Sequence, residues 1–305
     1  MGSVAIVIVN WNSGSQLRDC VDSIILHGVQ LRIATIIVDN GSTDGSSESV
    51  AGLENVKVIR AGSNLGFAKA CNLGASVAGD TDYLLFLNPD AELGAGALQK
   101  AVEFMDSESA MNIGICGVAL IDERGDVARS CARFPTPPRL AITASGLDRI
   151  FPRLGTTMRE WDHSRSCRVD QVIGAFFLIR KSLFVLLNGF DERFFVYFEE
   201  VDLAFRASRL GMRTMFLSDA KAFHAGGGTT TQVKATRLFY SLRSRILYAQ
   251  KHFRPVGCFF VIITAVALEP VVRTFNHLLR GQFLRAQETL AAYLMLLNWA
   301  MERKK

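Results

Sequence analysis

Five ionisable side chains stand where proteins often do chemistry, just past an apolar run or at the start of a predicted helix. They are Asp39, Asp90, Glu199, Glu200 and His224. Asp90 follows the apolar run Tyr83–Leu87 and the pair Asn88-Pro89. Proline cannot continue a strand ladder, so the Asp90 carboxylate is expected on a stiff turn at the carboxyl end of a strand. Open α/β sheets bind ligands at such ends, although Asn-Pro-Asp suits a solvated turn equally well.

Asp39, Asp90 and His224 suggest contacts with a nucleotide, a cation and a diphosphate. The carboxylate of Asp39 can accept the imide N–H of a uracil or thymine ring; an Asx turn or a helix cap is the alternative explanation. Asp90 can bind a hard divalent cation, because such ions take carboxylate oxygens together with substrate phosphates. His224 stands before a run of glycines and can join the cation or contact the diphosphate, with a structural histidine as the alternative.

Glu199 and Glu200 begin a helix predicted over residues 199–210. Acidic residues in a first helical turn interact favourably with the helix dipole, which is one explanation for the pair. The other is that one of them is a general base, with its pKa raised by the aromatic residues that precede it. Those aromatic residues are Phe194, Phe195, Tyr197 and Phe198.

Alternating strands and helices position these side chains. Apolar runs predict strands over residues 5–9, 34–38, 56–59, 83–87, 114–121, 172–179 and 214–217, and helical spacing predicts helices over 16–26, 68–78 and 96–105. Short connections between alternating strands and helices favour right-handed crossovers and a mostly parallel sheet. Four strands end in polar residues, so we expect one sheet edge to gather Asn10, Asp39, Arg60 and Asn88. Residues 122–168 lack periodicity and are predicted as loops and short helices that could close over an acceptor. His224 is expected to begin a flexible loop.

The composition excludes several classes of protein. The hydrophobic fraction is 49% and the Gly, Pro and charge contents are ordinary, which excludes a disordered or fibrous chain. The six cysteines have no paired spacing, so neither a zinc site nor a disulfide framework is expected. We therefore expect the protein in a reducing compartment. The first apolar run is short and has no basic residues before it, so no signal peptide is expected. The sequence contains no Walker loop, G-x-G-x-x-G or G-x-S-x-G motif.

Residues 234–305 differ from the rest of the chain in charge. They hold 12 lysines and arginines against 3 acidic residues, whereas residues 1–233 hold 22 against 26. Two apolar stretches, 256–268 and 291–300, are shorter than the about 20 residues that a spanning helix needs. We therefore expect amphipathic helices on an anionic membrane surface, with packing on the body or in a homodimer as the alternative. Binding to nucleic acid is not expected, because the charges flank apolar stretches instead of forming a polar arm.

Several segments, in this order, resemble the inverting family 2 glycosyltransferases of the GT-A fold, and most of all the bacterial rhamnosyltransferase-like group. The resemblance covers residues 4–250 and rests on Val7-Ile8-Val9-Asn10-Trp11-Asn12, Val38-Asp39-Asn40-Gly41-Ser42-Thr43-Asp44, Asn64-Leu65-Gly66-Phe67-Ala68, Phe86-Leu87-Asn88-Pro89-Asp90, Phe198-Glu199-Glu200-Val201-Asp202-Leu203 and His224-Ala225-Gly226-Gly227. It implies an α/β catalytic domain over residues 1–233 with a central, mostly parallel sheet and flanking helices. A basic, amphipathic, membrane-associating helical extension would follow over residues 234–305.

The resemblance also implies a role for each matching residue. Asn10 and Asp39 would hold the nucleotide, and Asn64, Gly66 and Asn88 would line its pocket. Asp90 and His224 would hold Mg²⁺ or Mn²⁺. Glu200 would be the catalytic base, and Glu199 is kept as an alternative. Two departures from the family's pattern weaken these roles, because Asn88 replaces a carboxylate and Glu200 replaces an aspartate.

The activity so implied is transfer of a sugar from a nucleotide-diphosphate donor, with dTDP-L-rhamnose favoured and a UDP-sugar next. The acceptor would be a glycan or a lipid-linked saccharide in cell-surface polysaccharide synthesis, at the cytoplasmic, inner face of the cell membrane. Two alternatives are a sugar nucleotidyltransferase and a non-catalytic, membrane-associated protein that binds a nucleotide sugar. The first is disfavoured because residues 10–17 contain no lysine or arginine to grip a triphosphate.

Overall fold

The computed structural model describes residues 2–28, 31–226 and 234–302. The chain forms two compact units. The first consists of Met1–Ala132, Trp161–Phe195 and Glu199–Thr229, and the second of Arg133–Glu160, Val196–Phe198 and Thr230–Lys305. The boundary expected at residue 233 adjoins residues 227–233, which lie outside the described part. Residues 133–160 and 196–198, which we expected in the catalytic domain, pack in the second unit.

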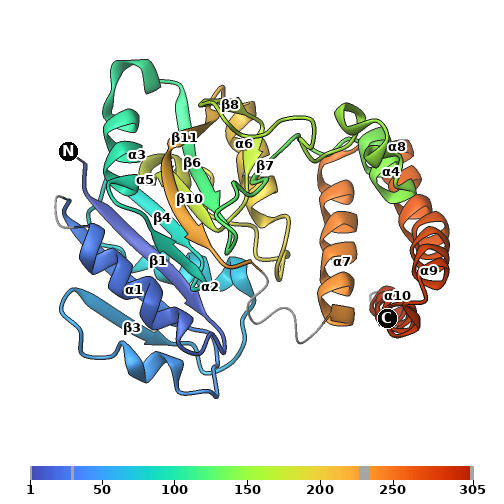
Figure 1. The fold of residues 1–305 in the computed structure, drawn as a ribbon, viewed down its shortest axis with the longest axis horizontal. Helices are drawn as coiled ribbons and strands as arrows, with labels where there is room; N and C mark the ends of the chain where they lie inside the picture. The colour runs from blue at the N-terminus through green and yellow to red at the C-terminus, as the bar shows by residue number, and fades with distance from the viewer. Residues whose placement is uncertain (1, 29–30, 227–233, 303–305) are drawn as a thin grey trace. The chain divides into compact units, whose positions relative to one another are not determined.

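The first unit contains one large sheet (Figure 1). Its strands follow the order β3-β2-β1-β4-β10-β6-β11-β5, with β8 also paired to β11. Four neighbouring strands are parallel, as expected: β1 (Val4–Asn10), β2 (Ile33–Asp39), β3 (Val56–Arg60) and β4 (Tyr83–Leu87). The other strands are β5 (Ala91–Leu93), β6 (Ile113–Ile121), β8 (Cys167–Val169), β10 (Phe176–Arg180) and β11 (Arg213–His224). Strand β10 is antiparallel to both of its neighbours, so the sheet is mixed.

The strand register brings the predicted polar ends to one edge. Asn10 pairs with Asp39 across β1 and β2, and Asp39 pairs with Arg60 across β2 and β3. On the other side of β1, Ile8 pairs with Leu87, so β4 ends at the same level. The expectation that these four strand ends lie at one edge is confirmed.

Helices cover the sheet because each presents an apolar stripe to it. They are α1 (Gln16–His27), α2 (Phe67–Ser76), α3 (Ala97–Asp106), α5 (Lys181–Leu186) and α6 (Glu199–Arg209). Helix α1 buries Leu17, Val21 and Ile24 at three- and four-residue spacing, as an amphipathic helix must. Helix α2 approaches β1 closely at Gly74, where a Cβ would lie 2.4 Å from Val7 Cγ1. Only glycine allows this close packing without a shift of the helix.

Two strand predictions needed correction. The single strand expected over residues 172–179 is divided into β9 (Gln171–Val172), which pairs with β7 (Cys131–Ala132), and β10. The strand expected over 214–217 continues to His224, because a bulge after Leu217 lets the chain pair again with β6 and then with β5. His224 is therefore the last residue of a strand, and its expected place in a flexible loop was wrong.

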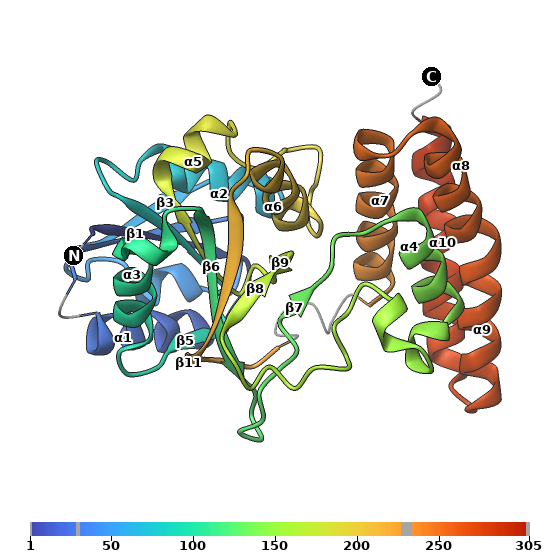
Figure 2. The same cartoon turned by 90° about the horizontal axis from the view of Figure 1, so that it is seen from above.

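The second unit is helical. Its helices are α4 (Pro137–Ser145), α7 (Lys234–His252), α8 (Pro255–Ile263), α9 (Glu269–Leu279) and α10 (Phe283–Glu302). A π-helical turn, Thr264–Leu268, joins α8 to α9, so one helix runs from Pro255 to Leu279 (Figure 2). We expected Glu269-Pro270 to interrupt the helix. Instead, the wider turn accommodates the missing proline N–H, and Thr264 Oγ1 bonds back to the carbonyl oxygens of Phe260 and Val261.

This helix of 25 residues is, in the part of the chain that the structure describes, the one candidate long and apolar enough to cross a membrane, judged by length and composition. The expectation of a short apolar stretch here was therefore wrong. Helix α7 packs on α10 through Phe239, Leu242, Ile246 and residues around Tyr293. Arg245 of α7 forms a buried two-pronged ion pair with Glu269 of α9, with N–O distances of 2.5 and 3.2 Å.

Candidate active site

Asn10 and Asp39 form a buried polar corner at the ends of β1 and β2. The Asn10 side-chain amide donates to Asp39 Oδ1 at 3.3 Å, to Ser42 Oγ at 3.1 Å and to Ser46 Oγ at 2.8 Å. Asp39 Oδ1 also accepts the backbone N–H of Ser42, so the structural turn that we kept as an alternative is present. Among the described residues no donor contacts Asp39 Oδ2. That oxygen remains available to a ligand, so the two explanations for Asp39 are compatible.

Asn64 and Gly66 shape the backbone where α2 begins. Asn64 Oδ1 accepts hydrogen bonds from Asn40 Nδ2 at 3.1 Å and from the Gly66 N–H at 3.0 Å. Gly66 has a φ of 83°, and a Cβ there would lie 2.6 Å from the carbonyl oxygen of Phe195. The next N–H, that of Phe67, donates to the same oxygen at 2.6 Å. Gly66 thus lets the segment before Glu199 dock against the start of α2.

Asn88, Asp90 and His224 come together from segments far apart in the sequence. His224 Nε2 lies 3.3 Å from Asp90 Oδ1 and 3.5 Å from Asn88 Nδ2. Both the Asp90 and His224 side chains are largely buried, and the pairing of β11 with β5 fixes their separation. The predicted convergence of Asp90 and His224 is therefore observed.

Asn88, Asp90 and His224 fit a cation site whose remaining ligands would come from the nucleotide-sugar substrate. Residues 2–28, 31–226 and 234–302 contain no group of three or more His, Cys, Asp or Glu side chains suited to a metal ion. A carboxylate and a neutral imidazole suffice, however, where substrate phosphates and water supply the remaining ligands. An orientation in which the Asn88 side-chain oxygen faces the ion would add a weak third ligand.

Glu199 and Glu200 differ in their surroundings. Glu199 is 4% exposed, and burial raises its pKa well above the ordinary value of 4.5, with a further contribution from the charge of Glu200. Glu200 is partly exposed as a residue, although its Oε2 atom is buried. The two residues before Glu199 have left-handed backbones, with φ of 66° at Tyr197 and 70° at Phe198. Such strain in aromatic residues is costly and is concentrated at functional sites.

Two polar contacts that we did not anticipate hold the segment before Glu199 in place. Asn72 of α2 bonds to both the N–H and the carbonyl oxygen of Phe190, each at 2.9 Å. Arg206 pairs with the fully buried Asp202, four residues earlier in α6, at 2.7 Å. The contact that was not anticipated is its donation to the carbonyl oxygens of Leu187 and Gly189. No pattern in the sequence of α2, which also contains the polar residues Lys69 and Ser76, marks Asn72 for this contact.

Comparison with known proteins identifies the family. The family model described as Glycosyl transferase family 2 matches residues 5–184, more than half of the chain. The chain belongs to glycosyl transferase family 2. This family 2 chain is 30% identical over 264 residues to an N-acetylglucosaminyl-diphospho-decaprenol L-rhamnosyltransferase of Mycobacterium tuberculosis, covering 81% of this chain and 84% of the relative. It is also 23% identical over 261 residues to the dTDP-rhamnosyl transferase RfbF of Shigella flexneri, covering 82% and 81%.

Solved structures show the same fold. The mannosyltransferase PcManGT of Pyrobaculum calidifontis, in complex with GDP-Man and Mn²⁺, matches with a TM-score of 0.59 at 14% identity, over 97% of this chain and 87% of that one. GalNAc-T7 with UDP, GalNAc and Mn²⁺ matches with a TM-score of 0.57 at 16% identity, over 82% and 51%. The expected GT-A fold is confirmed, and this family 2 chain is a rhamnosyltransferase-like glycosyltransferase.

Proposed function

We propose that the protein transfers L-rhamnose from dTDP-L-rhamnose to a hydroxyl of a lipid-linked saccharide, with inversion at the anomeric carbon. The observation that carries this proposal is the pairing of Asp90 with His224 at the sheet edge where Asn10 and Asp39 also end. The names of the Mycobacterium and Shigella relatives favour rhamnose as the sugar, and the former favours a diphospholipid acceptor.

Asp39 would select the base of the donor. Its Oδ1 is engaged by Asn10 and Ser42, which fixes the carboxylate, and Oδ2 would accept the imide N–H of thymine or uracil. Neutral adenine and cytosine have no ring N–H at the corresponding edge, whereas guanine has one. The name of the Shigella relative, a dTDP-rhamnosyl transferase, favours thymine over guanine, so a thymine or uracil nucleotide is the expected donor.

Asp90 and His224 would hold Mg²⁺ or Mn²⁺ against the donor diphosphate. When bound, the ion neutralises negative charge on the leaving nucleoside diphosphate. The protein's own contribution is to keep the carboxylate and the imidazole 3.3 Å apart in a largely buried position.

Glu200 would remove the proton from the acceptor hydroxyl. Burial favours the protonated form of Glu199, which makes Glu199 a poor acceptor of a further proton. A carboxylate in its ionised form can accept a proton from an attacking hydroxyl. Glu199 is the alternative base.

The second unit would attach the enzyme to the inner face of the cell membrane. The Pro255–Leu279 helix has a mean hydropathy of 2.1 over its most apolar window, only 22% of which is buried. Exposed apolar area of this extent favours a lipid environment or a partner. A homodimer that covers the same area is the alternative.

Product analysis tests the proposed reaction. The full chain is incubated with dTDP-L-rhamnose or UDP-sugars, Mn²⁺ and a lipid-diphosphate saccharide, and the products are identified by mass spectrometry and NMR. We expect release of dTDP only when the acceptor is present, together with an inverted glycosidic bond. Release of diphosphate from a sugar phosphate and a nucleoside triphosphate would support a nucleotidyltransferase instead, and donor binding without turnover would support a binding protein.

A further inference from the structure

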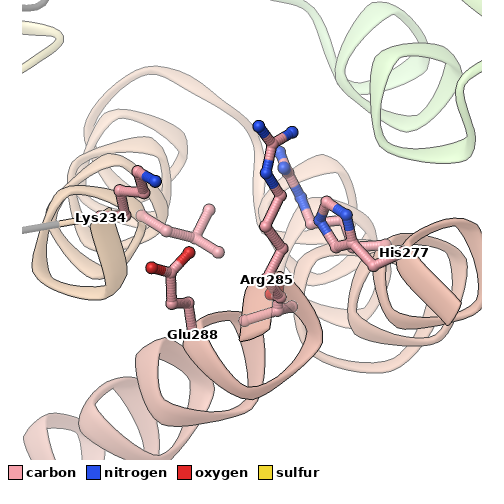
Figure 3. A pocket seen from close by; sticks show the side chains of 7 residues that line it. Lys234, His277, Arg285 and Glu288 are labelled. Atoms are coloured by element: carbon pink, nitrogen blue, oxygen red, sulfur yellow. Dashed lines mark hydrogen bonds between the residues drawn. The ribbon is translucent and has the colours of Figure 1, made fainter. Parts of the chain in front are cut away.

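The second unit contains a small cavity bordered by basic side chains from three helices (Figure 3). Its volume is about 150 Å³. The lining residues are Lys234 and Leu238 of α7, Arg273 and His277 of α9, and Arg285, Glu288 and Thr289 of α10. Nothing in the catalytic proposal uses these side chains.

The positive charge in this cavity is not balanced by its own lining. Lys234, Arg273 and Arg285 face a single carboxylate, Glu288. Arg273 uses Nε to bond Glu269 at 2.7 Å, and within the described part of the chain its two terminal nitrogens have no partner. No ion pair among the described residues involves Lys234 or Arg285. The cavity therefore has donors and net positive charge available for an anion.

His277 also lines the cavity, and its ring is held by a glutamine. Its Nδ1 lies 3.2 Å from Gln282 Oε1, a contact in which the imidazole donates and the amide oxygen accepts. Gln282 Oε1 also accepts from Arg285 Nη1 at 3.4 Å, so the same glutamine orients both side chains. In Figure 3 the labelled Lys234 of α7, His277 of α9, and Arg285 and Glu288 of α10 surround the cavity.

The size of the cavity limits the ligand. Pockets that enclose whole small molecules measure about 300–1,000 Å³, so a cavity of this size suits one anionic group and not a nucleotide sugar. Arginine and lysine are the usual partners of phosphate, since guanidinium matches two phosphate oxygens at once. A phosphate or diphosphate group is the anion that these side chains fit.

Exposed apolar side chains on α9 and α10, two of the helices that line the cavity, indicate that the phosphate is attached to hydrocarbon. The end of α9 and the start of α10 carry five exposed, large apolar residues close in sequence to His277 and Arg285: Phe275, Leu278, Leu279, Phe283 and Leu284. A soluble phosphate would leave this surface in water. We propose that the α7–α9–α10 cavity binds the phosphate of a lipid, whose chain lies on these apolar residues. This inference rests on the proposed membrane association but does not depend on which sugar is transferred.

Two sources offer the same chemistry, an anionic phospholipid of the bilayer and the lipid diphosphate that carries the acceptor. The first experiment measures sedimentation of the full chain with vesicles of phosphatidylcholine alone, with added phosphatidylglycerol, or with added polyprenyl diphosphate. An increase with phosphatidylglycerol identifies a bilayer headgroup as the source. An increase confined to polyprenyl diphosphate identifies the acceptor lipid. Equal sedimentation with all three vesicles would overturn the proposal.

Matched variants separate the cavity from general surface charge. Lys234→Gln and Arg285→Gln remove exposed side chains that make few internal contacts, and each should weaken binding to the anionic vesicles by about tenfold. Arg280→Gln removes the same charge from an exposed position outside the cavity and should have a much smaller effect. Glu288→Gln removes the one opposing carboxylate and should tighten binding, a gain that misfolding cannot imitate. Equal losses for Arg285→Gln and Arg280→Gln, or no gain for Glu288→Gln, would overturn the proposal.

A second measurement is independent of vesicles. Titration of the full chain with inorganic pyrophosphate, followed by calorimetry in a chelator so that no cation is held at Asp90, should show saturable binding that Arg285→Gln weakens and Arg280→Gln does not. No binding by the wild type would contradict the assignment. Failure of the proposed sugar transfer would appear separately, as the absence of nucleoside diphosphate release.

Discussion

Burial distinguishes Glu199 from Glu200, because it raises the pKa of Glu199 while Glu200 is the partly exposed residue of the pair. If Glu200 is the base, Glu200→Gln should lower turnover by about 10²–10⁴-fold, the usual contribution of a general base, because the amide cannot accept the proton. Donor affinity should change little, since the amide keeps the shape of the side chain. Turnover is measured as dTDP release, and donor affinity by calorimetry.

Glu199→Gln is the matched control for this assignment. It preserves a neutral side chain beside Glu200 and should reduce turnover far less than Glu200→Gln. Should Glu199→Gln prove the more damaging of the two, the base would be Glu199.

The raised pKa of Glu199 also makes stability depend on pH. Below its ordinary pKa of 4.5 the group is protonated in both the folded and unfolded states and has no effect. Above that pH the unfolded chain ionises Glu199 while the folded chain retains the proton. The free energy of unfolding therefore falls as pH rises, by up to about 1.4 kcal/mol per pH unit until the folded-state pKa is passed.

Glu199→Gln lacks this ionisation and should be more stable than the wild type at neutral pH. Thermal unfolding of both proteins from pH 5 to pH 8 measures the difference, which should grow as pH rises. A difference that is constant with pH would show that Glu199 does not have a raised pKa.

Asp90 and His224 test the metal proposal. Asp90→Ala and His224→Ala should each weaken donor binding in Mn²⁺ by about tenfold or more, since each removes one of two protein ligands. In a chelator the wild type and both variants should bind the donor equally weakly. Full wild-type activity in the chelator would remove the metal from the proposal.

At the scale of the element, the start of α2 packs against the segment that ends at Phe195. Gly66→Ala places a methyl group against Phe195 at a left-handed backbone position, with an expected loss of about 2–4 kcal/mol in the free energy of unfolding. Turnover should fall as well, because the docked segment leads into Glu199. Denaturant unfolding and dTDP release measure the two effects.

Gly62→Ala is a close control, since Gly62 also has a positive φ, of 76°, but nothing lies within 4 Å of its Cβ position. That variant should show only the backbone strain, about 1–2 kcal/mol, with turnover unchanged. Equal effects of the two substitutions would mean that the contact with Phe195 does not position the glutamates.

Local patterns were sufficient for the strands that carry Asn10, Asp39 and Asn88. Each is a short, buried apolar run that ends at a polar residue or before proline, and such runs predict both the strand and its end. The convergence of His224 with Asp90 required the family resemblance, because it depends on β11 continuing past a bulge to reach β5. A bulge depends on tertiary pairing and leaves no periodic signal in the sequence.

Other features depend on long-range packing in the same way. The contact between Gly66 and Phe195 joins residues far apart in the chain, and no pattern around either residue predicts it. Pro270 was expected to end a helix, as proline usually does. The helix continues because the preceding π turn accommodates the lack of a backbone N–H at Pro270. Propensity alone therefore underestimated the length of the apolar helix.

At the scale of the whole molecule, the second unit differs from the first in the apolar area that it leaves uncovered. Exposed aromatic and aliphatic residues follow one another along the Pro255–Leu279 helix, including Phe259, Ile263, Val271, Phe275 and Leu279. Exposed apolar residues of the first unit occur alone or as adjacent pairs, such as Ile25 with Leu26 and Val185 with Leu186. Continuous apolar area favours lipid or a second copy of the chain as its partner.

The double substitution Phe275→Gln with Leu279→Gln decides between these partners. Transfer of each side chain from water to hydrocarbon is worth about 1.5–3 kcal/mol, so the double variant should weaken sedimentation with neutral phosphatidylcholine vesicles by at least about tenfold. Leu26→Gln, an equally exposed position in the first unit, should leave sedimentation unchanged. If vesicle binding survives the double substitution while a dimer seen by analytical ultracentrifugation is lost, the surface is an interface between two copies of the chain, and the membrane proposal fails for this helix.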